Sequence, residues 1–166
     1  MQKVCSLIIK KLRCFFCLLG PSSFEVCWKK PPARVYKINA DGAIADDGRR
    51  LSIGMVIRDF RGEVVAALCR VLPGNFSVGE TEALAVKAGI LLAKEMDLHQ
   101  IIVESNSLSV VQSISSKDFR GEIDYIFHGI LSFLEGFSSW QVRHLKRDYN
   151  RVVHELARFA RCNDIN

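Results

Sequence analysis

The periodicity of the apolar residues changes near residue 77, and this change constrains the fold more than any other feature of the sequence. Before it lie three short segments of strand character, residues 36–43, 51–58 and 63–71, joined by turns rich in Asp and Gly. Short turns between consecutive strands predict an antiparallel meander. After it, residues 77–97 carry Leu and Ala at helical spacing, with acids in the first turn, where the helix dipole favours them. The chain therefore combines a sheet with helices.

The elements expected after this helix complete an α/β domain. Residues 99–104 form a short apolar run that indicates a buried strand, reached by a parallel crossover. We further expect a helix from candidate caps at residues 105–107 through Ile114, a helix over 121–137, a strand over 139–145 and a helix over 150–162. The order β-β-β-α-β-α-α-β-α predicts an α/β fold with a mixed five-stranded sheet flanked by helices. In such a sheet the first and fourth strands are neighbours.

Length and composition allow one domain with a hydrophobic core of its own. The chain has 166 residues, of which 49% are hydrophobic and 25% are charged, as is typical of a globular protein. Pro31 and Pro32 force extended backbone just before the first strand, so the domain boundary is expected near residues 28–34. We predict a poorly ordered leader over residues 1–33, a domain over 34–162 and a tail over 163–166.

The net charge of +5 says little about what the domain binds, because the charge is unevenly placed. Residues 1–34 hold seven Lys or Arg residues and one Glu, a formal charge of +6. The remaining 16 basic and 17 acidic residues sum to −1. The body of the chain is therefore close to neutral.

The leader and the cysteines bear on the compartment. The apolar run of residues 14–19 is too short to span a bilayer, and a secretory or organelle-targeting signal is the alternative to a poorly ordered leader. Cys14 and Cys17 form a C-x-x-C without a second Cys/His pair at suitable spacing, which disfavours a zinc site. The six scattered cysteines require no disulfide framework. A reducing compartment, cytoplasmic or nuclear, is therefore the default expectation.

The first strand ends in an acid followed directly by glycine. By the two-residue period, Ile38 and Ala40 share one face of the strand with Tyr36, while Asp41 lies on the other face. Gly42 permits a close approach of another backbone beside this acid. An isolated Asp-Gly pair most simply marks a turn.

Three further polar residues are expected at the same rim of the sheet. Glu82 lies in the opening turn of the long helix, Asn106 follows the fourth strand and His154 begins the last helix. Oxygen-rich clusters of this kind hold Mg²⁺ or Mn²⁺, and two such ions about 4 Å apart activate a water in phosphodiester cleavage. Taken singly, Glu82 is more simply a helix-start acid and Asn106 a helix cap. His99 and His128 fit no such pattern and are expected on the surface or in packing.

Five motifs in sequence order resemble the ribonuclease H type 1 domain, and within it the plant group of reverse-transcriptase-like ribonuclease H proteins. The resemblance covers about residues 28–162. It rests on Trp28 to Pro32 followed by Lys37 to Ala43 (KINADGA), Ile53 to Asp59 (IGMVIRD), Glu80 to Gly89 (ETEALAVKAG), Ile101 to Leu108 (IIVESNSL) and His144 to Ala157. Each motif alone is modest evidence, but five in the right order outweigh the separate interpretations above.

The resemblance implies a carboxylate tetrad that binds two Mg²⁺ ions and hydrolyses the RNA strand of an RNA/DNA hybrid, leaving a 3′-hydroxyl and a 5′-phosphate. Carried over by position, Asp41 and Glu82 are the first two members. Asn106 stands where the family has Asp, and His154 takes the fourth position, a change that resembles the plant group. His144 matches the family's mobile-loop histidine, which assists proton transfer or product release; taken alone, it merely ends a strand.

A charge count predicts weak catalysis. Asp41 and Glu82 supply a charge of −2, where four carboxylates would supply −4. Asn106 offers a neutral oxygen, and His154 a nitrogen that suits Mn²⁺ or Zn²⁺ better than Mg²⁺. Glu104 lies on the same strand face as Asn106 and is an alternative ligand, but its side chain starts about 7 Å further back. We expect Mg²⁺ or Mn²⁺ to bind poorly and hydrolysis to be weak or lost.

One basic cluster is expected to contact nucleic acid beside His144: Arg143, Lys146, Arg147 and Arg151. A solvated charged edge is the alternative. Residues 121–137 carry no Lys or Arg, unlike the basic handle of some ribonucleases H, so affinity should be low and fall steeply with salt. The expected partner is an RNA/DNA hybrid, bound by a monomer without a small-molecule cofactor or membrane contact. The alternatives are a non-catalytic nucleic-acid or protein interaction module, and a decayed retroelement fragment.

Overall fold

The computed structural model describes residues 29–45, 50–119, 121, 123–163 and 165. The strands are β1 (Tyr36–Ile44), β2 (Leu51–Arg58), β3 (Val64–Leu72), β4 (Gln100–Ser105) and β5 (Ser139–His144). The helices are α2 (Val78–Glu95), α3 (Leu108–Ser116), α4 (Asp124–Leu134) and α5 (Arg151–Cys162), with a 3₁₀ turn, η2 (Arg147–Asn150), before α5. This order confirms the predicted one. The C-x-x-C pair, most of the leader and the turn expected after β1 lie outside the described residues.

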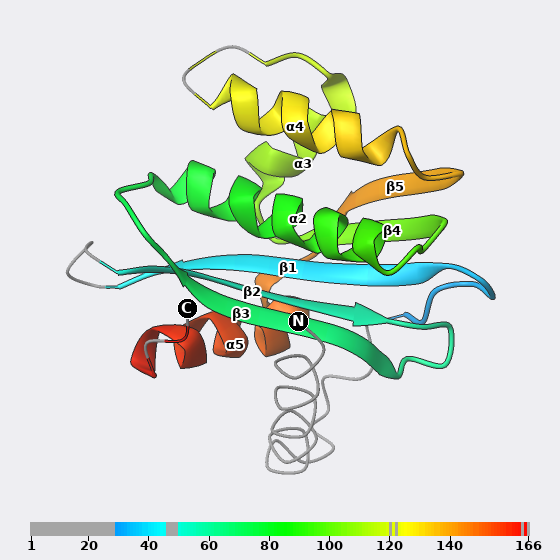
Figure 1. The fold of residues 1–166 in the computed structure, drawn as a ribbon, viewed down its shortest axis with the longest axis horizontal. Coiled ribbons are helices and arrows are strands. Elements are labelled where there is room, and N and C mark those ends of the chain that lie inside the picture. Colours follow the sequence, from blue (N-terminus) through cyan, green and yellow to red (C-terminus); the bar gives the residue numbers. More distant parts are fainter. Residues whose placement is uncertain (1–28, 46–49, 120, 122, 164, 166) are drawn as a thin grey trace.

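The five strands form one mixed sheet in the order β3-β2-β1-β4-β5. β1 pairs with β2, and β2 with β3, in antiparallel register. β1 pairs with β4, and β4 with β5, in parallel register. The prediction that the first and fourth strands are neighbours is therefore confirmed, and the carboxyl ends of β1, β4 and β5 point the same way (Figure 1).

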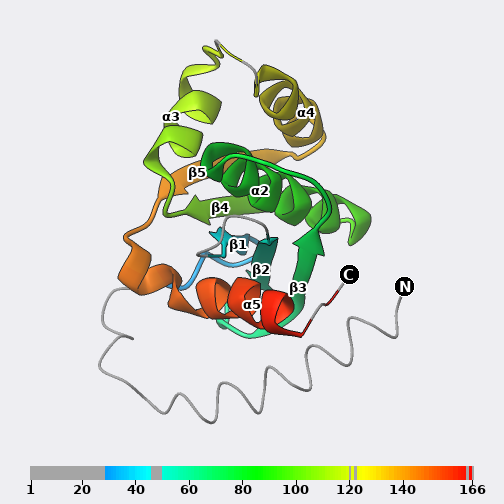
Figure 2. The same ribbon diagram turned by 90° about the vertical axis from the view of Figure 1, so that its left-hand side faces the viewer.

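Helices cover both faces of the sheet. Figures 1 and 2 show α2, α3 and α4 on one side and α5 on the other. The larger core lies under α2 and α4 and includes Ile38, Met55, Val86, Ile90 and Ile130, each fully buried. The smaller core, around Val56 and Val153, lies under α5. Apolar burial on both faces explains why the chain forms three layers.

The alternation predicted for β1 holds, but both of its faces are buried. Ile38 and Ala40 face the larger core. Asp41 is 2% exposed although it is charged, because α5 covers its face of the sheet. Further along this face, the ammonium of Lys37 donates to the carbonyl of Lys29, so the chain before β1 lies against the sheet as well. None of the helices in the described part of the chain is both long and apolar enough to cross a bilayer.

Candidate functional site

Asp41, Glu82, Asn106 and His154 lie together in the structure, as the sequence predicted, but Asp41 does not end the first strand, because β1 continues to Ile44. His154 Nδ1, in the first turn of α5, donates to Asp41 Oδ2 at 2.8 Å. The side chain of Asn106, just after β4, is near enough to Asp41 to oppose the rise in the pKa of that carboxyl. Glu82, in the first turns of α2, shares a hydrogen bond with Asp41 and accepts one from the backbone N–H of Gly42 at 3.1 Å. Asp41 is thus the centre of the group, with neighbours from three other elements.

Two glycines allow this convergence. A Cβ on Gly42 would lie 2.9 Å from Thr81 Cγ2 and 3.0 Å from the backbone N of Glu82. A Cβ on Gly54, the cross-strand partner of Asp41, would lie 2.4 Å from the carbonyl oxygen of Val153. These distances are too short for a side chain, so the missing Cβ atoms allow α2 to lie close to β1 at Gly42 and α5 to lie close to β2 at Gly54. The close approach expected beside Asp41 is confirmed at Gly42.

The start of α2 is set by its own cap, which leaves Glu82 free for the site. Ser77 accepts from the N–H of Glu80 at 3.2 Å, and the Glu80 carboxylate accepts from the N–H of Ser77 at 2.8 Å. This capping box stabilises the first turn without Glu82. Glu82 is 9% exposed, whereas an acid that merely complements the helix dipole stays in solvent.

Burial keeps a proton on the pair of carboxyl groups. Burial, and then the charge of Asp41, raise the pKa of Glu82 to about 8 from its ordinary value of 4.5. Burial also raises the pKa of Asp41, while hydrogen bonds from His154 and Asn106 and the charge of Arg147 oppose the rise. At neutral pH the protonated Glu82 therefore donates to Asp41. The two groups carry less negative charge than the two acids counted in the sequence.

Asn150 is a member of the site to which the sequence assigned no role. It is 2% exposed, and its Nδ2 donates to the backbone carbonyl of Ala40 at 2.9 Å and to Asn106 Oδ1 at 2.8 Å. Its own Oδ1 is buried without a hydrogen-bond partner in the described part of the structure. Nothing in the local sequence distinguishes this Asn from a helix cap, yet its side chain makes no cap hydrogen bond to α5.

Asn106 does not cap α3, although that was its simplest separate interpretation. The N-cap is Ser107, whose side chain makes no cap hydrogen bond either. The oxygen of the Asn106 amide instead accepts from Asn150 Nδ2 at 2.8 Å within the site.

Glu104 belongs to a separate buried network. Its carboxylate pairs with Lys37 Nζ at 2.8 Å and accepts from Asn39 Nδ2 at 3.0 Å. Arg58 donates to Asn39 Oδ1 at 2.8 Å, and burial lowers the pKa of Arg58 to about 10 while the charge of Glu104 opposes this fall. The network ties β1 to its neighbours β2 and β4. The alternative that Glu104 supplies a missing ligand is therefore wrong.

His144 and the basic residues follow the same rim. His144 Nε2 donates to the backbone carbonyl of Asn106 at 3.2 Å, and the ring is exposed. The charge of Arg147 acts on both Asp41 and Glu82. The four basic residues predicted to contact nucleic acid are all exposed: Arg143, Lys146, Arg147 and Arg151. They lie on the segment that runs from the end of β5 through η2 to the start of α5, which Figure 2 shows passing one edge of the sheet.

The arrangement does not fit a centre for two divalent ions. Asp41 and Glu82 are the two acids of the group, Asn106 offers a neutral amide, and Asp41 Oδ2 is already engaged by His154 Nδ1 at 2.8 Å. Among the described residues, no group of three or more His, Cys, Asp or Glu side chains is placed to hold a metal ion. Two hard cations need several oxygen ligands and their negative charge, which this set lacks.

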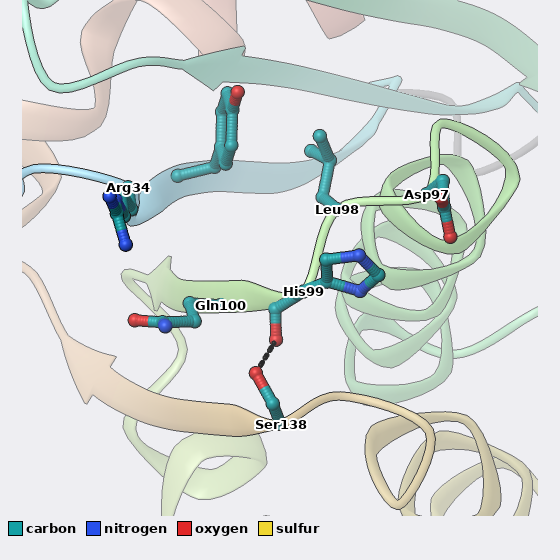
Figure 3. Close-up of a pocket in the computed structure, with 7 residues that line it drawn as sticks. Arg34, Asp97, Leu98, His99, Gln100 and Ser138 are labelled. Atoms are coloured by element: carbon teal, nitrogen blue, oxygen red, sulfur yellow. Dashed lines mark hydrogen bonds between the residues drawn. The ribbon is translucent and has the colours of Figure 1, made fainter.

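A cavity of about 550 Å³ lies at the amino ends of β1 and β4, away from Asp41. It is lined by Tyr36, which begins β1, by residues 97–100, which lead from the end of α2 into β4, and by Arg34 and Ser138 (Figure 3). Ser138 Oγ donates to the carbonyl of His99 at 2.9 Å, while the exposed His99 takes no part in the site at Asp41. His128 is exposed as well and packs edge-on against Phe119 at 5.3 Å. Both histidines are the surface and packing residues that were expected.

The order of the five strands and the helices on both faces of the sheet define the chain as an α/β protein of the ribonuclease H-like fold. A family model described as reverse transcriptase-like matches residues 39–160, and the chain belongs to this family. The match spans Asp41, Glu82, Asn106 and His154. A search of curated proteins finds no match.

Solved structures support the fold assignment. RNase H1 from the archaeon Halobacterium salinarum is 21% identical, with 78% of this chain and 98% of that chain covered and a TM-score of 0.72. The N-terminal RNase H domain of a Mycobacterium tuberculosis protein is 19% identical over 78% and 95%, with a TM-score of 0.71. LC11-RNase H1, isolated from compost and solved with an RNA/DNA hybrid, is 20% identical over 77% and 97%, with a TM-score of 0.70. At these identities the likeness establishes the fold.

Proposed function

We propose that this chain is an RNA/DNA-hybrid-binding domain of the ribonuclease H type in which metal-dependent cleavage of the RNA strand is weak or lost. The observation that carries the proposal is the group around Asp41. Asp41, Glu82, His154 and Asn106 lie together at the rim of this fold, but Asp41 and Glu82 are the two acids in the group and share a proton. The four side chains lie together, but their negative charge is lower than two Mg²⁺ or Mn²⁺ ions require.

Binding of the hybrid rests on the exposed cations beside the group. Arg143, Lys146, Arg147 and Arg151 lie along β5, η2 and α5, and Arg147 is close enough for its charge to act on Asp41. Phosphate contacts supply most sequence-independent affinity, and 2′-hydroxyl contacts across a shallow minor groove distinguish the RNA strand. That LC11-RNase H1 was solved with an RNA/DNA hybrid supports this choice of ligand. α3 and α4 carry no Lys or Arg, so the affinity should be low.

His144 has a supporting role in this proposal. Its exposed ring lies next to Asn106, at the end of β5, within reach of a substrate on the rim. Imidazole is a common general acid and base, which suits proton transfer to or from a leaving group. In a domain that only binds, the same ring contacts the backbone of the nucleic acid.

A labelled hybrid tests both parts of the proposal. Binding is measured by gel shift or anisotropy, and cleavage is followed with Mg²⁺ and with Mn²⁺ for the parent chain, Asp41→Asn and Asn106→Asp. We expect salt-sensitive binding with little product, and more product from Asn106→Asp because it returns a carboxylate to the group. Any product of the parent chain should disappear in Asp41→Asn.

Other outcomes contradict the proposal in distinct ways. Rapid cleavage by the parent chain that needs Asp41 would show a competent nuclease. Neither binding nor cleavage would favour a protein interaction module or a decayed retroelement fragment. Folded Asn106→Asp protein that gives no more product would show that the missing acid does not limit cleavage.

We also propose that the chain belongs to the plant group of this family. Placement in the plant group rests on the opening signature Trp28 to Pro32 and on His154 at the fourth position. The domain limits of 34–162 and the monomeric state also stay predictions. Size-exclusion chromatography with light scattering, combined with limited proteolysis, measures both the oligomeric state and the limits.

A further inference from the structure

We propose that the cavity at the amino ends of β1 and β4 binds a nucleoside monophosphate, with the phosphate at Arg34 and the base toward Asp97. The cavity lies away from Asp41, so this site goes beyond the hybrid-binding function and does not rest on it. The proposal follows from the backbone conformation of two charged residues, from the placement of the side chains around the cavity and from its size.

Two charged residues of the cavity have a backbone conformation that ordinarily belongs to glycine. Arg34 has a φ of 67° and Asp97 a φ of 58°, and both line the cavity. In the described part of the chain, Lys117 is the one further residue other than glycine with a positive φ, and it lies elsewhere, at the end of α3. Side chains disfavour this region, and residues held in it gather at functional sites. The cavity therefore combines two strained positions with two charges.

The local structure requires neither side chain. Arg34 is the third residue of a turn in which the N–H of Val35 donates to the carbonyl of Pro32 at 3.1 Å. Asp97 follows α2, where its own N–H and that of the next residue donate to carbonyls of the last helical turn, at 3.0 Å each. Both motifs use backbone groups alone, and glycine is common at both positions. Among the residues that the structure describes, no hydrogen bond or ion pair engages either charged group, so both are open to a ligand.

The two charges stand on different sides of the cavity. Figure 3 shows Arg34 and Gln100 on one side and Asp97 on the other, with Leu98 and His99 between them. A ligand that spans the cavity meets a cation and an amide at one end and a carboxylate at the other. The first end suits an anion, and the second suits a hydrogen-bond donor.

A nucleoside monophosphate carries matching groups in this order. Its phosphate fits the guanidinium of Arg34, which can donate two parallel hydrogen bonds. Its flat base fits the half-buried side chains of Tyr36 and Leu98, since aromatic rings stack on bases of any sequence. An exocyclic amine, as in adenine, donates to the carboxylate of Asp97. The volume of about 550 Å³ is within the roughly 300–1,000 Å³ of pockets that hold small ligands.

Titration calorimetry with adenosine monophosphate (AMP) tests the site. The other probes are inorganic phosphate, adenosine and a short single-stranded RNA with a 5′-phosphate. We expect AMP to bind more tightly than phosphate or adenosine, because AMP alone among these three meets both ends of the cavity. Arg34→Gly should weaken AMP binding about tenfold or more, and Asp97→Gly about threefold, since each removes a hydrogen bond to a charged group.

Lys117→Gly is the matched control. It also removes an exposed charged side chain at a positive φ, but away from the cavity, and it should leave the Kd for AMP unchanged. Glycine adopts a positive φ without steric cost, so all three variants should fold, which melting temperatures check. A change in AMP binding then reports the lost side chain and not a lost fold.

The outcomes separate the alternatives. A folded parent chain that does not bind AMP, or binds phosphate equally tightly, overturns the proposal, and so does an unchanged Kd in Arg34→Gly or an equal loss in Lys117→Gly. Binding of AMP alone supports a free nucleotide as the ligand, whereas binding of both AMP and the RNA supports the terminal nucleotide of a strand. A failure of hybrid binding would overturn the proposed function and leave these titrations unaffected.

Discussion

His154 Nδ1 lies 2.8 Å from Asp41 Oδ2, so the first turn of α5 is hydrogen-bonded to the acid of the central strand. The two residues are 113 positions apart in the chain. In a site for two divalent ions, both positions would hold acids that face the cations. Here the imidazole occupies one side of Asp41, and the protonated Glu82 and the amide of Asn106 occupy others.

These contacts stabilise the group without cations. Several acids placed close together repel one another unless cations or protons neutralise them. In this chain the group contains a neutral amide and an imidazole beside two acids, and the pair of acids holds a proton. A group of this kind is compatible with a folded domain that binds nucleic acid and cleaves it poorly.

The shared proton makes stability depend on pH. The pKa of Glu82 is about 8 in the folded chain and near 4.5 when exposed, so between these values the folded state keeps a proton that the unfolded state releases. The free energy of unfolding therefore falls as pH rises from about 4.5 to about 8. Glu82→Gln keeps the shape and removes this titration, so its stability should depend less on pH.

Urea unfolding at pH 5, 6.5 and 8 measures this difference between the parent chain and Glu82→Gln. Glu80→Gln is the matched control, because Glu80 is an acid in the same helix turn and is not buried. It should retain the pH dependence of the parent chain. Equal slopes for the parent chain and Glu82→Gln would show that Glu82 does not hold the proton.

The close approach of α5 to β2 predicts a large cost for one methyl group. In Gly54→Ala the new Cβ would meet the carbonyl oxygen of Val153 at 2.4 Å and the N of Ala157 at 2.7 Å. Backbone atoms cannot move aside as a flexible side chain does, so α5 must shift, at a cost of about 1–3 kcal/mol. Gly79→Ala is the control, because its Cβ would meet only Ile123 Cδ1 at 4.0 Å.

Thermal and urea unfolding compare these two variants. Gly79→Ala, within α2, should be neutral or stabilise by up to about 1 kcal/mol, since Ala favours a helix more than Gly does. If Gly54→Ala is as stable as the parent chain, the backbone of α5 does not pack closely against Gly54, and the prediction is wrong.

Local patterns were enough to predict the architecture but not the hydrogen bonds of the site. β2 was predicted over residues 51–58 and has these bounds, because the alternation of apolar residues is a property of neighbouring positions. The convergence of Asp41 with Asn106 followed from the strand order. The orientation of the Asn106 amide depends on Asn150, which lies 44 positions away, and the shared proton depends on burial. Neither can be derived from spacing.

Glu104 shows the same limit at a neighbouring position. Its place on the strand face of Asn106 made it an alternative ligand, yet its carboxylate is engaged by Lys37 Nζ at 2.8 Å and by Asn39. Whether Glu104 turns to the site or away from it depends on Lys37 and Asn39 of the adjacent strand. That information lies in the register of β1 and β4, where Asn39 is the partner of Glu104.

The buried pair of Lys37 and Glu104 should matter for stability rather than for cleavage. Its side chains are 4% and 7% exposed. Glu104→Ala leaves a buried ammonium without this partner, and we expect a loss of about 3–5 kcal/mol in the free energy of unfolding. Glu155→Ala is the control: it breaks the pair with Arg158, at 3.3 Å, in which Arg158 is 53% exposed, and should cost about 0–1 kcal/mol. Similar losses in both would contradict this ranking.

Arg147 should contribute to hybrid binding more than a cation at the other end of β1. Its side chain is exposed, and its charge acts on both Asp41 and Glu82, which places it beside the rim. Arg147→Ala should weaken hybrid binding and lower the slope of log K against log salt by about 1, since one phosphate contact is lost.

Arg61→Ala is the control, because Arg61 is exposed in the turn between β2 and β3 and lies over the ring of Phe60. Anisotropy titrations between 50 and 200 mM salt, about the range over which such contacts respond, measure both slopes. Equal losses in the two variants would indicate diffuse electrostatic attraction and would remove Arg147 from the binding surface.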